Sequence, residues 1–332
     1  MKPGVFITFD VECSMGGAWG NPSLRPVSPL RAVWGEYGCR KLGLPWIVEI
    51  LERHGLTATF FVEAFMEDQG YPGHGERICQ YLLTHEQDVQ LHIHPNHKHF
   101  GLKQQGQPFP FTDSLADLSP AEQLALIRTG SDRIQQWTGR RPHAFRAGNM
   151  GASEESLRQL EAADIRIDSS YTFPYLGGQC RFNDTARYNG SKWYGGVLEM
   201  AMSGFRQTIL SELGRPKPLD LMGISFEECR DAIRRIHGAG VDAVMILHSF
   251  SLFKVRNVQY EGGKADWIIA RRFRRLCAWL AKEQMPVYTF SELANALAAG
   301  TYEARCVAPC LLVHPRALVR KAVQAWNRMY WT

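Results

Sequence analysis

The sequence predicts an α/β fold in which parallel strands alternate with helices, arranged as a barrel with long loops at the strand ends. Three observations lead to this prediction. Apolar runs rich in β-branched and aromatic residues recur, amphipathic stretches of helical period separate them, and glycine or proline marks many junctions. Helices between successive buried strands make parallel βαβ units. About six or seven such units suit a barrel better than an open sheet, although the pattern itself allows both.

The first half of the chain begins with a buried strand at residues 5–12, a run of β-branched and aromatic residues that ends in the carboxylates of Asp10 and Glu12. Ser119 and Pro120 mark the start of a later helix, since serine is a favoured N-cap and proline a favoured first residue. The other expected elements of this half are strands at 57–63, 88–94 and 144–146, and helices at 45–54, 76–84 and 120–138.

The second half continues the alternation. We expect strands at 165–168, 197–200, 242–248 and 286–290, and helices at 153–163, 225–237, 267–283 and from Ser291 onward. Two stretches interrupt the rhythm, at residues 16–43 and 173–223, and both are rich in glycine and other loop-forming residues. Long loops at strand ends commonly shape substrate sites.

Composition and charge narrow the class of protein. The 332 residues are 45% hydrophobic and 21% charged, as in an ordinary globular protein. The net charge of +5 lies in the tail: residues 305–332 hold five basic and no acidic residues, which leaves 33 basic against 33 acidic elsewhere. A neutral body argues against a nucleic-acid partner. We therefore divide the chain into a main body at 1–300 and a basic amphipathic extension at 301–332, and the oligomeric state stays open.

The cysteines and the start of the chain predict where the protein works. Eight cysteines are scattered without a disulfide or metal-binding pattern, so reduced thiols are the simplest interpretation. The first strand begins almost at Met1, which leaves no room for a secretion signal before it. We therefore expect a cytoplasmic protein.

Charged and titratable residues follow the strands at their carboxyl ends. These residues are Asp10, Glu12, His92, His94, Arg146, Asp168 and His248. In parallel α/β folds ligands and catalysis occupy that edge. A single histidine there would more often be structural, but seven such groups at one edge predict an active site.

Two pairs in this set predict a metal centre. Asp10 and Glu12 lie two residues apart, as do His92 and His94, so each pair shares one face of its strand. Two imidazoles with one carboxylate are typical of catalytic zinc and accept other divalent transition metals. His97 and His99 crowd the same loop, and either could replace His94 as a ligand.

The order of these motifs resembles the polysaccharide deacetylases, the NodB-homology family or carbohydrate esterase family 4. The resemblance spans roughly residues 4–298, and the motifs that carry it are Thr8–Glu12, His92–Pro95, Thr138–Pro142 with Phe145–Asn149, Asp168–Ser170 and Leu247–Ser249. It implies a distorted (β/α) barrel and the metal-dependent hydrolysis of an N-acyl group, usually an acetyl group on an amino sugar.

The resemblance also implies a role for each site residue. Asp10 would be the general base, Arg146 would hold Asp10, His248 would be the general acid, and Glu12, His92 and His94 would bind the divalent metal, with Zn²⁺ preferred. Two departures leave alternatives open. The usual pair of aspartates is replaced by Asp10 and Glu12, so base and ligand could be exchanged. The histidine loop is shortened, unless His97 is the second histidine ligand.

The expected substrate is an N-acetyl or N-formyl amino sugar in a surface polysaccharide or a lipid-linked precursor. An inactive carbohydrate-binding barrel, or a hydrolase of a non-sugar amide, is the alternative. The tail predicts an amphipathic helix at 316–331, basic on one side and apolar on the other. Its apolar face would pack on the barrel or a second subunit, or residues 315–331 would contact the inner face of a membrane.

Overall fold

The structure is a computed structural model, and it describes residues 1–183, 186–208, 214–313 and 317–329. Its centre is a curled nine-stranded sheet in the order β12-β1-β4-β5-β6-β7-β9-β8-β15. The strands are β1 (Val5–Val11), β4 (Thr59–Glu63), β5 (Asp88–Ile93), β6 (Ala144–Ala147), β7 (Ile167–Asp168), β8 (Asn189–Tyr194), β9 (Val197–Ala201), β12 (Ala243–His248) and β15 (Cys306–Val307). All neighbours from β12 to β9 are parallel, whereas β8 and β15 are antiparallel additions.

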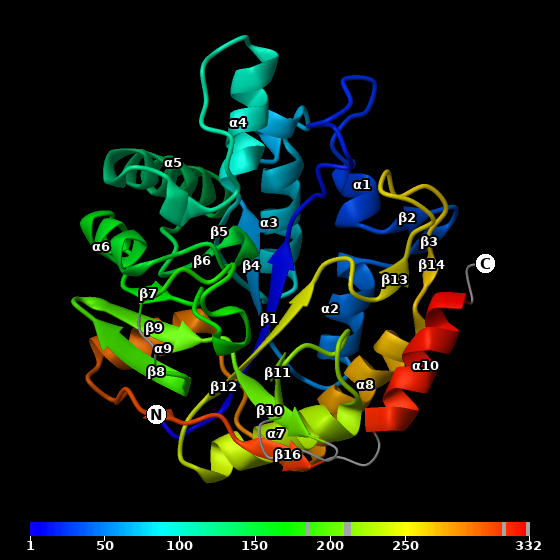
Figure 1. Ribbon diagram of the computed structural model, residues 1–332, viewed down its shortest axis with the longest axis vertical. Helices are drawn as coiled ribbons and strands as arrows, with labels where there is room; N and C mark the ends of the chain where they lie inside the picture. The colour runs from blue at the N-terminus through cyan, green and yellow to red at the C-terminus, as the bar shows by residue number, and fades with distance from the viewer. Residues whose placement is uncertain (184–185, 209–213, 314–316, 330–332) are drawn as a thin grey trace.

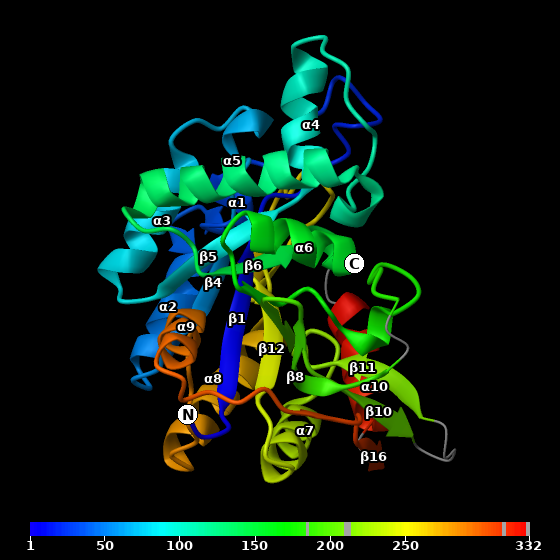
Figure 2. The same ribbon diagram turned by 90° about the vertical axis from the view of Figure 1, so that its left-hand side faces the viewer.

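The parallel part of the sheet returns to its own beginning. Met202, directly after β9, forms a parallel bridge with Val244 of β12, and the Ser203 amide donates to the Val244 carbonyl over 2.8 Å. The two ends of the parallel part of the sheet, β12 and β9, therefore meet, and this gives the curled sheet the form of a distorted barrel (Figures 1 and 2). The α/β barrel predicted from the sequence is confirmed.

Helices surround this sheet and the smaller elements attached to it, as Figures 1 and 2 show. They are α1 (Pro29–Ala32), α2 (Leu44–Glu52), α3 (His74–Thr84), α4 (Pro95–Gln104), α5 (Pro120–Thr138), α6 (Glu154–Ala162), α7 (Phe226–Gly238), α8 (Trp267–Lys282), α9 (Phe290–Ala298) and α10 (Ala317–Met329). Ser119 caps α5 as predicted, in a capping box with Glu122 that satisfies amide groups at both residues.

The smaller elements lie in the two irregular stretches, in the tail and at the strand ends. They are β2 (Glu36–Tyr37) with β3 (Arg40–Lys41), β13 (Phe253–Lys254) with β14 (Lys264–Ala265), and a sheet of β11 (Arg215–Pro218), β10 (Gly204–Thr208) and β16 (Leu311–Val313). Short 3₁₀ turns are η1 (Glu67–Gln69), η2 (Leu115–Asp117), η3 (Gly148–Met150) and η4 (Phe173–Tyr175). The extension after residue 300 thus adds β15 and β16 to two sheets of the body.

The alternation of side chains along β1 explains where the site forms. Phe9 faces outward and stacks on Phe60 at a centroid distance of 4.9 Å, in the core beneath the helices. Phe6 faces the barrel interior, where it meets Phe290 at 5.3 Å. Thr8 and Asp10 share the inward face with Phe6, because successive residues alternate. The interior is therefore apolar at one end and polar at the other.

One expected strand is absent from the described residues. Residues 286–290 form only a single bridge, between Val287 and Val5, and α9 already begins at Phe290. The reason is local: Thr289 and Glu292 form a capping box that starts the helix.

No helix among residues 1–183, 186–208, 214–313 and 317–329 is long and apolar enough to cross a bilayer.

Candidate active site

A small hollow of about 50 Å³ opens at the carboxyl ends of the barrel strands. Its lining includes Asp10, Glu12, His92, His94, Arg146 and His248, together with Ala147, Asn149, Met150 and Met202. The register of the sheet explains the convergence, because Asp10 pairs with His248 across β1 and β12, and His92 pairs with Arg146 across β5 and β6. The six residues predicted for catalysis and metal binding therefore lie together.

Glu12, His92 and His94 form one compact group. Oε2 of Glu12 lies 2.5 Å from Nε2 of His94 and 3.2 Å from Nε2 of His92. The ligand atoms of the three side chains all lie within 4.8 Å of one another. Two imidazole nitrogens and a carboxylate oxygen are a donor set suited to zinc and similar divalent ions.

Hydrogen bonds on the far side of each imidazole support this assignment. Nδ1 of His92 lies 2.8 Å from the Arg146 carbonyl, which can only accept, so this nitrogen carries the proton and Nε2 is left toward Glu12. Nδ1 of His94 lies 3.0 Å from Oδ2 of Asp113. Metal-binding histidines typically make such bonds to a carbonyl or carboxylate, so the residues present fit a divalent metal.

Charge within the group shifts two pKa values in opposite directions. Burial would raise the pKa of Glu12, but His94 and His92 outweigh it and hold that pKa well below its ordinary value. Burial would lower the pKa of His94, but the carboxylates of Glu12 and Asp113 raise it well above its ordinary value. The pocket therefore favours the carboxylate form of Glu12, which is the form that binds a metal, whereas a bound cation would have to displace the proton of His94.

Asp10 has different partners. Its Oδ1 accepts a hydrogen bond of 2.7 Å from Nη1 of Arg146, and the same nitrogen donates to Oγ1 of Thr8 over 2.8 Å. Arg146 is fully buried, and its other donors bind the carbonyl and hydroxyl oxygens of Ser169. The ring of Phe61 lies 4.1 Å beneath the guanidinium. The guanidinium thus fixes Asp10 beside the group of Glu12, His92 and His94.

His248 faces the group from β12. Its Nε2 lies 3.8 Å from Oε1 of Glu12, its ring stacks on Phe250 at 4.9 Å, and 27% of its side chain is exposed. Nearby, burial raises the pKa of Asp220, and His248 counteracts this shift, so the two side chains interact. His248 is therefore more exposed than Glu12, of which 16% of the side chain is exposed.

The sequence analysis missed three polar residues of the site. Glu63, at the end of β4, is fully buried and accepts the backbone amide of His94 over 2.7 Å. The strand-end rule applied to the other residues would have found it. Asp113 and Asp220 lie in irregular segments, and no sequence pattern singled them out.

Three residues that the sequence analysis named do not belong to the group of Glu12, His92 and His94. Nδ1 of His97 lies 3.3 Å from Oε2 of Glu63, and its ring stacks on His94 without joining the three-residue group. His99 is likewise outside that group. Asp168 does not line the hollow and instead accepts from the Ser170 hydroxyl over 2.7 Å.

The backbone next to the site is strained. Asn149 and Met150, which follow β6, have φ angles of 52° and 55°, a conformation that residues other than glycine rarely adopt. The Asn149 side chain donates to Asp113, which in turn contacts His94. Strain of this kind concentrates at functional sites.

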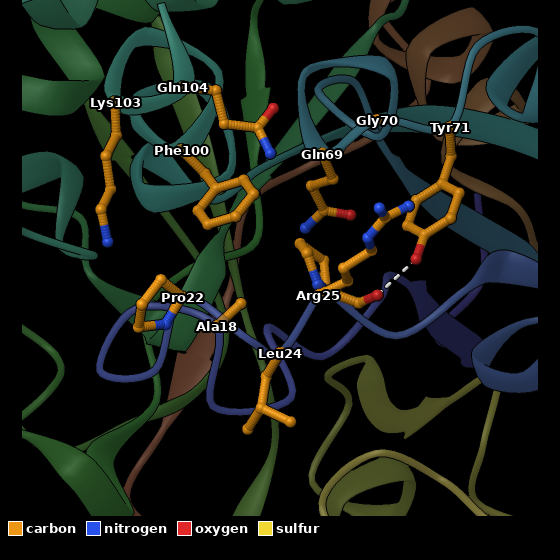
Figure 3. Close-up of a pocket in the computed structure, with 11 residues that line it drawn as sticks. Ala18, Pro22, Leu24, Arg25, Gln69, Gly70, Tyr71, Phe100, Lys103 and Gln104 are labelled. Atoms are coloured by element: carbon orange, nitrogen blue, oxygen red, sulfur yellow. Dashed lines mark hydrogen bonds between the residues drawn. The ribbon is translucent and has the colours of Figure 1, made fainter. Parts of the chain in front are cut away.

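Two larger hollows flank the site. One of about 540 Å³ lies between the segment after β1, η1 and α4, and Figure 3 shows Arg25, Lys103 and Phe100 around it. It adjoins the chain just beyond Glu12, since Gln69 in its wall contacts Met15. The other, of about 480 Å³, includes Phe250, Tyr260 and Met222 in its wall and lies on the side of His248. Both hollows therefore lie beside segments that contact or follow residues of the site.

Comparison with known proteins relates this architecture to one group. No protein-family model matches the sequence, and no curated protein matches it either. Among solved structures, a candidate polysaccharide deacetylase from Mycobacterium smegmatis has a TM-score of 0.54 at 14% identity, over 92% of this chain and 93% of that one.

Two further structures resemble the chain at a TM-score of 0.44 and 14% identity. A family 4 carbohydrate esterase from Streptomyces lividans, in complex with acetate, matches over 93% of this chain and all of its own. A family 4 pseudoenzyme from Bacillus anthracis matches over 88% and 66%. The chain has the fold of the solved candidate polysaccharide deacetylase from Mycobacterium smegmatis, in agreement with the fold that the resemblance of its motifs implied.

Proposed function

We propose that this protein is a metal-dependent N-deacylase that removes an acetyl or formyl group from an amino sugar. One observation carries the proposal: the two carboxylates of the first strand have separate partners. Glu12 faces His92 and His94, whereas Asp10 is bound to Arg146. A purely structural or carbohydrate-binding site has no need for this division.

The metal would be held by Glu12, His92 and His94, with Zn²⁺ as the preferred ion. When bound, such an ion polarises the acyl oxygen and makes water a stronger nucleophile at neutral pH. The fit rests on the donor set and on the bonds that orient both imidazoles.

Asp10 would act as the general base. Arg146 engages Oδ1 of this buried carboxylate, and the second oxygen would accept a proton from the attacking water. Arg146 does not react, because it is engaged by Asp10, Thr8 and Ser169. Its role is to position the base.

His248 would act as the general acid. It faces the metal-binding group from β12 and is partly exposed, so it can give a proton to the departing amine and regain one from solvent. The acid and the base thus stand on the neighbouring strands β12 and β1.

The substrate would be an N-acyl amino sugar of a surface polysaccharide or of a lipid-linked precursor. Support comes from the hollows beside the site, whose walls combine cationic, amide and aromatic side chains. The cytoplasmic location, at the inner face of the membrane, stays a prediction that cell fractionation would test.

The substrate class can be tested directly. The purified protein, loaded with Zn²⁺, should release free amine from N-acetyl or N-formyl amino sugars and not from simple peptide amides. Asp132→Asn, at an exposed position of α5, serves as a control with unchanged activity. Hydrolysis of peptide amides at the same rate as sugar amides would refute the sugar specificity.

A further inference from the structure

The C-terminal helix α10 is attached to the body through its polar side. Arg320 is only 5% exposed, and its Nε lies 2.9 Å from Oε2 of the fully buried Glu228. Nη1 of Arg320 donates to the Gly223 carbonyl and Nη2 to Oε1 of Gln207, each over 2.9 Å. A buried ion pair of this kind is costly to break, because Glu228 would be left without its partner.

Two more residues of the same face complete the attachment. Gln324 donates to the Met222 carbonyl over 3.0 Å, and Asn327 donates to Oδ2 of Asp266 over 3.0 Å. Arg320, Gln324 and Asn327 are spaced by four and three residues and therefore share one side of the helix. This side holds α10 in a fixed orientation.

The apolar side of α10 consequently faces outward. Val319 is 61% exposed and Trp326 is 59% exposed, and Ala322 between them is exposed as well. The expectation that the apolar side packs on the barrel is wrong for these described residues. Figure 1 shows α10 at the periphery of the molecule, beside α8.

The charge around this surface points to an anionic occupant. Besides the buried Arg320, the sequence of α10 contains two basic and no acidic residues, and besides the buried Arg272, that of α8 contains four basic and none acidic. Asn327 joins the two helices through Asp266, the N-cap of α8, and Trp267 at the start of α8 is 59% exposed. A second copy of the chain would bring like charges together across a symmetric contact.

We propose that α10 is a membrane-surface helix whose outward apolar side, with Val319 and Trp326, binds an anionic lipid bilayer. Basic residues beside exposed tryptophan are the features of helices that lie in the membrane interface. Because α10 is already folded and oriented by Arg320, its binding requires no ordering of the helix. The proposal does not depend on the chemistry of the active site.

Co-sedimentation of the full chain with vesicles tests the proposal. The wild type should bind vesicles of phosphatidylcholine with one third phosphatidylglycerol, bind pure phosphatidylcholine about tenfold less, and release at high salt. The double variant Val319→Glu, Trp326→Glu should lose binding by about tenfold or more, with each single variant in between. Both positions are exposed, so thermal unfolding should be unchanged.

The matched control is Phe111→Glu, which places the same charge at another exposed apolar position, 77% exposed, on the loop between α4 and α5. It should bind vesicles like the wild type. Equal binding by the double variant, or no preference of the wild type for anionic vesicles, would overturn the proposal. So would a wild-type dimer in solution that the double variant converts to monomers, since a second copy would then cover this face.

Discussion

Arg146 and Asp10 form an ion pair across the barrel interior, with Nη1 and Oδ1 2.7 Å apart and both side chains buried. The pair joins β6 to β1, which are separated in the sheet by β4 and β5. It can form only because the sheet curls and brings the inward faces of these strands together. The fold thereby supplies the charged base that the proposed reaction requires.

Replacing Arg146 tests this pair. We expect Arg146→Met to lower the free energy of unfolding by about 3–5 kcal/mol, since Asp10 would remain buried without its partner. The double variant Arg146→Met, Asp10→Asn should recover part of this loss, because the unpaired charge is gone. Denaturant unfolding measures both, and additive losses in the double variant would show that the two side chains are not coupled.

Asp113 should tune metal affinity although it would not touch the metal. Asp113→Asn removes the carboxylate that lies 3.0 Å from Nδ1 of His94, and we expect Zn²⁺ affinity to fall by about 10–100-fold. Titration with a competing chelator measures this affinity. An unchanged dissociation constant would mean that the contact does not orient a ligand.

The effect of replacing His248 on the rate should depend on whether the leaving group needs a proton. An amine must be protonated as it departs, whereas a nitrophenolate leaves without a proton, so His248→Gln should slow amide hydrolysis by about 10²–10⁴-fold and nitrophenyl ester hydrolysis far less. Steady-state kinetics on both substrates with the same acyl group provides the comparison. Equal losses on both would assign His248 to binding instead of proton transfer.

A second pair of carboxylates should govern the dependence of stability on pH. Burial and the neighbouring Asp168 raise the pKa of Glu199 well above its usual 4.5 in the folded state. The folded protein therefore keeps a proton that the unfolded chain loses, so stability is greatest below the ordinary pKa and falls as pH rises through the raised one.

Glu199→Gln removes this titration and keeps an amide that can donate to Asp168. The free energy of unfolding of the wild type should fall, relative to this variant, by up to about 1.4 kcal/mol per pH unit above pH 5. Denaturant unfolding across the pH range compares the two proteins. Parallel pH profiles would show that Glu199 is ionised in the folded state.

The sequence predicted most of the barrel because its strands and helices carry strong local signals. The strand predicted at residues 5–12 forms β1 over Val5–Val11, and the cap at Ser119 and the strand that ends at His248 also appear where the pattern placed them. The strand-end rule brought the six proposed site residues together, since parallel strands share one polar edge. The strand predicted at residues 286–290 did not form, because the capping box at Thr289 starts helix α9 there.

Other features could not be predicted because they depend on tertiary contacts. Asp113 reaches His94 from an irregular loop whose path no periodicity defines. The orientation of α10 follows from Glu228, a buried acid on α7 that attracts Arg320 inward. Helical periodicity identifies the two sides of such a helix but does not tell which side packs on the body.

The central claim is that Glu12, His92 and His94 hold a metal while Asp10 activates water. The most direct test measures bound Zn²⁺ and amine release together in the wild type, Asp10→Asn and His92→Ala. We predict one Zn²⁺ per chain in the wild type and in Asp10→Asn, with amine release reduced by about 10²–10⁴-fold in the latter. His92→Ala should lose both. Loss of metal on replacing Asp10, or full activity of either variant, would contradict the account.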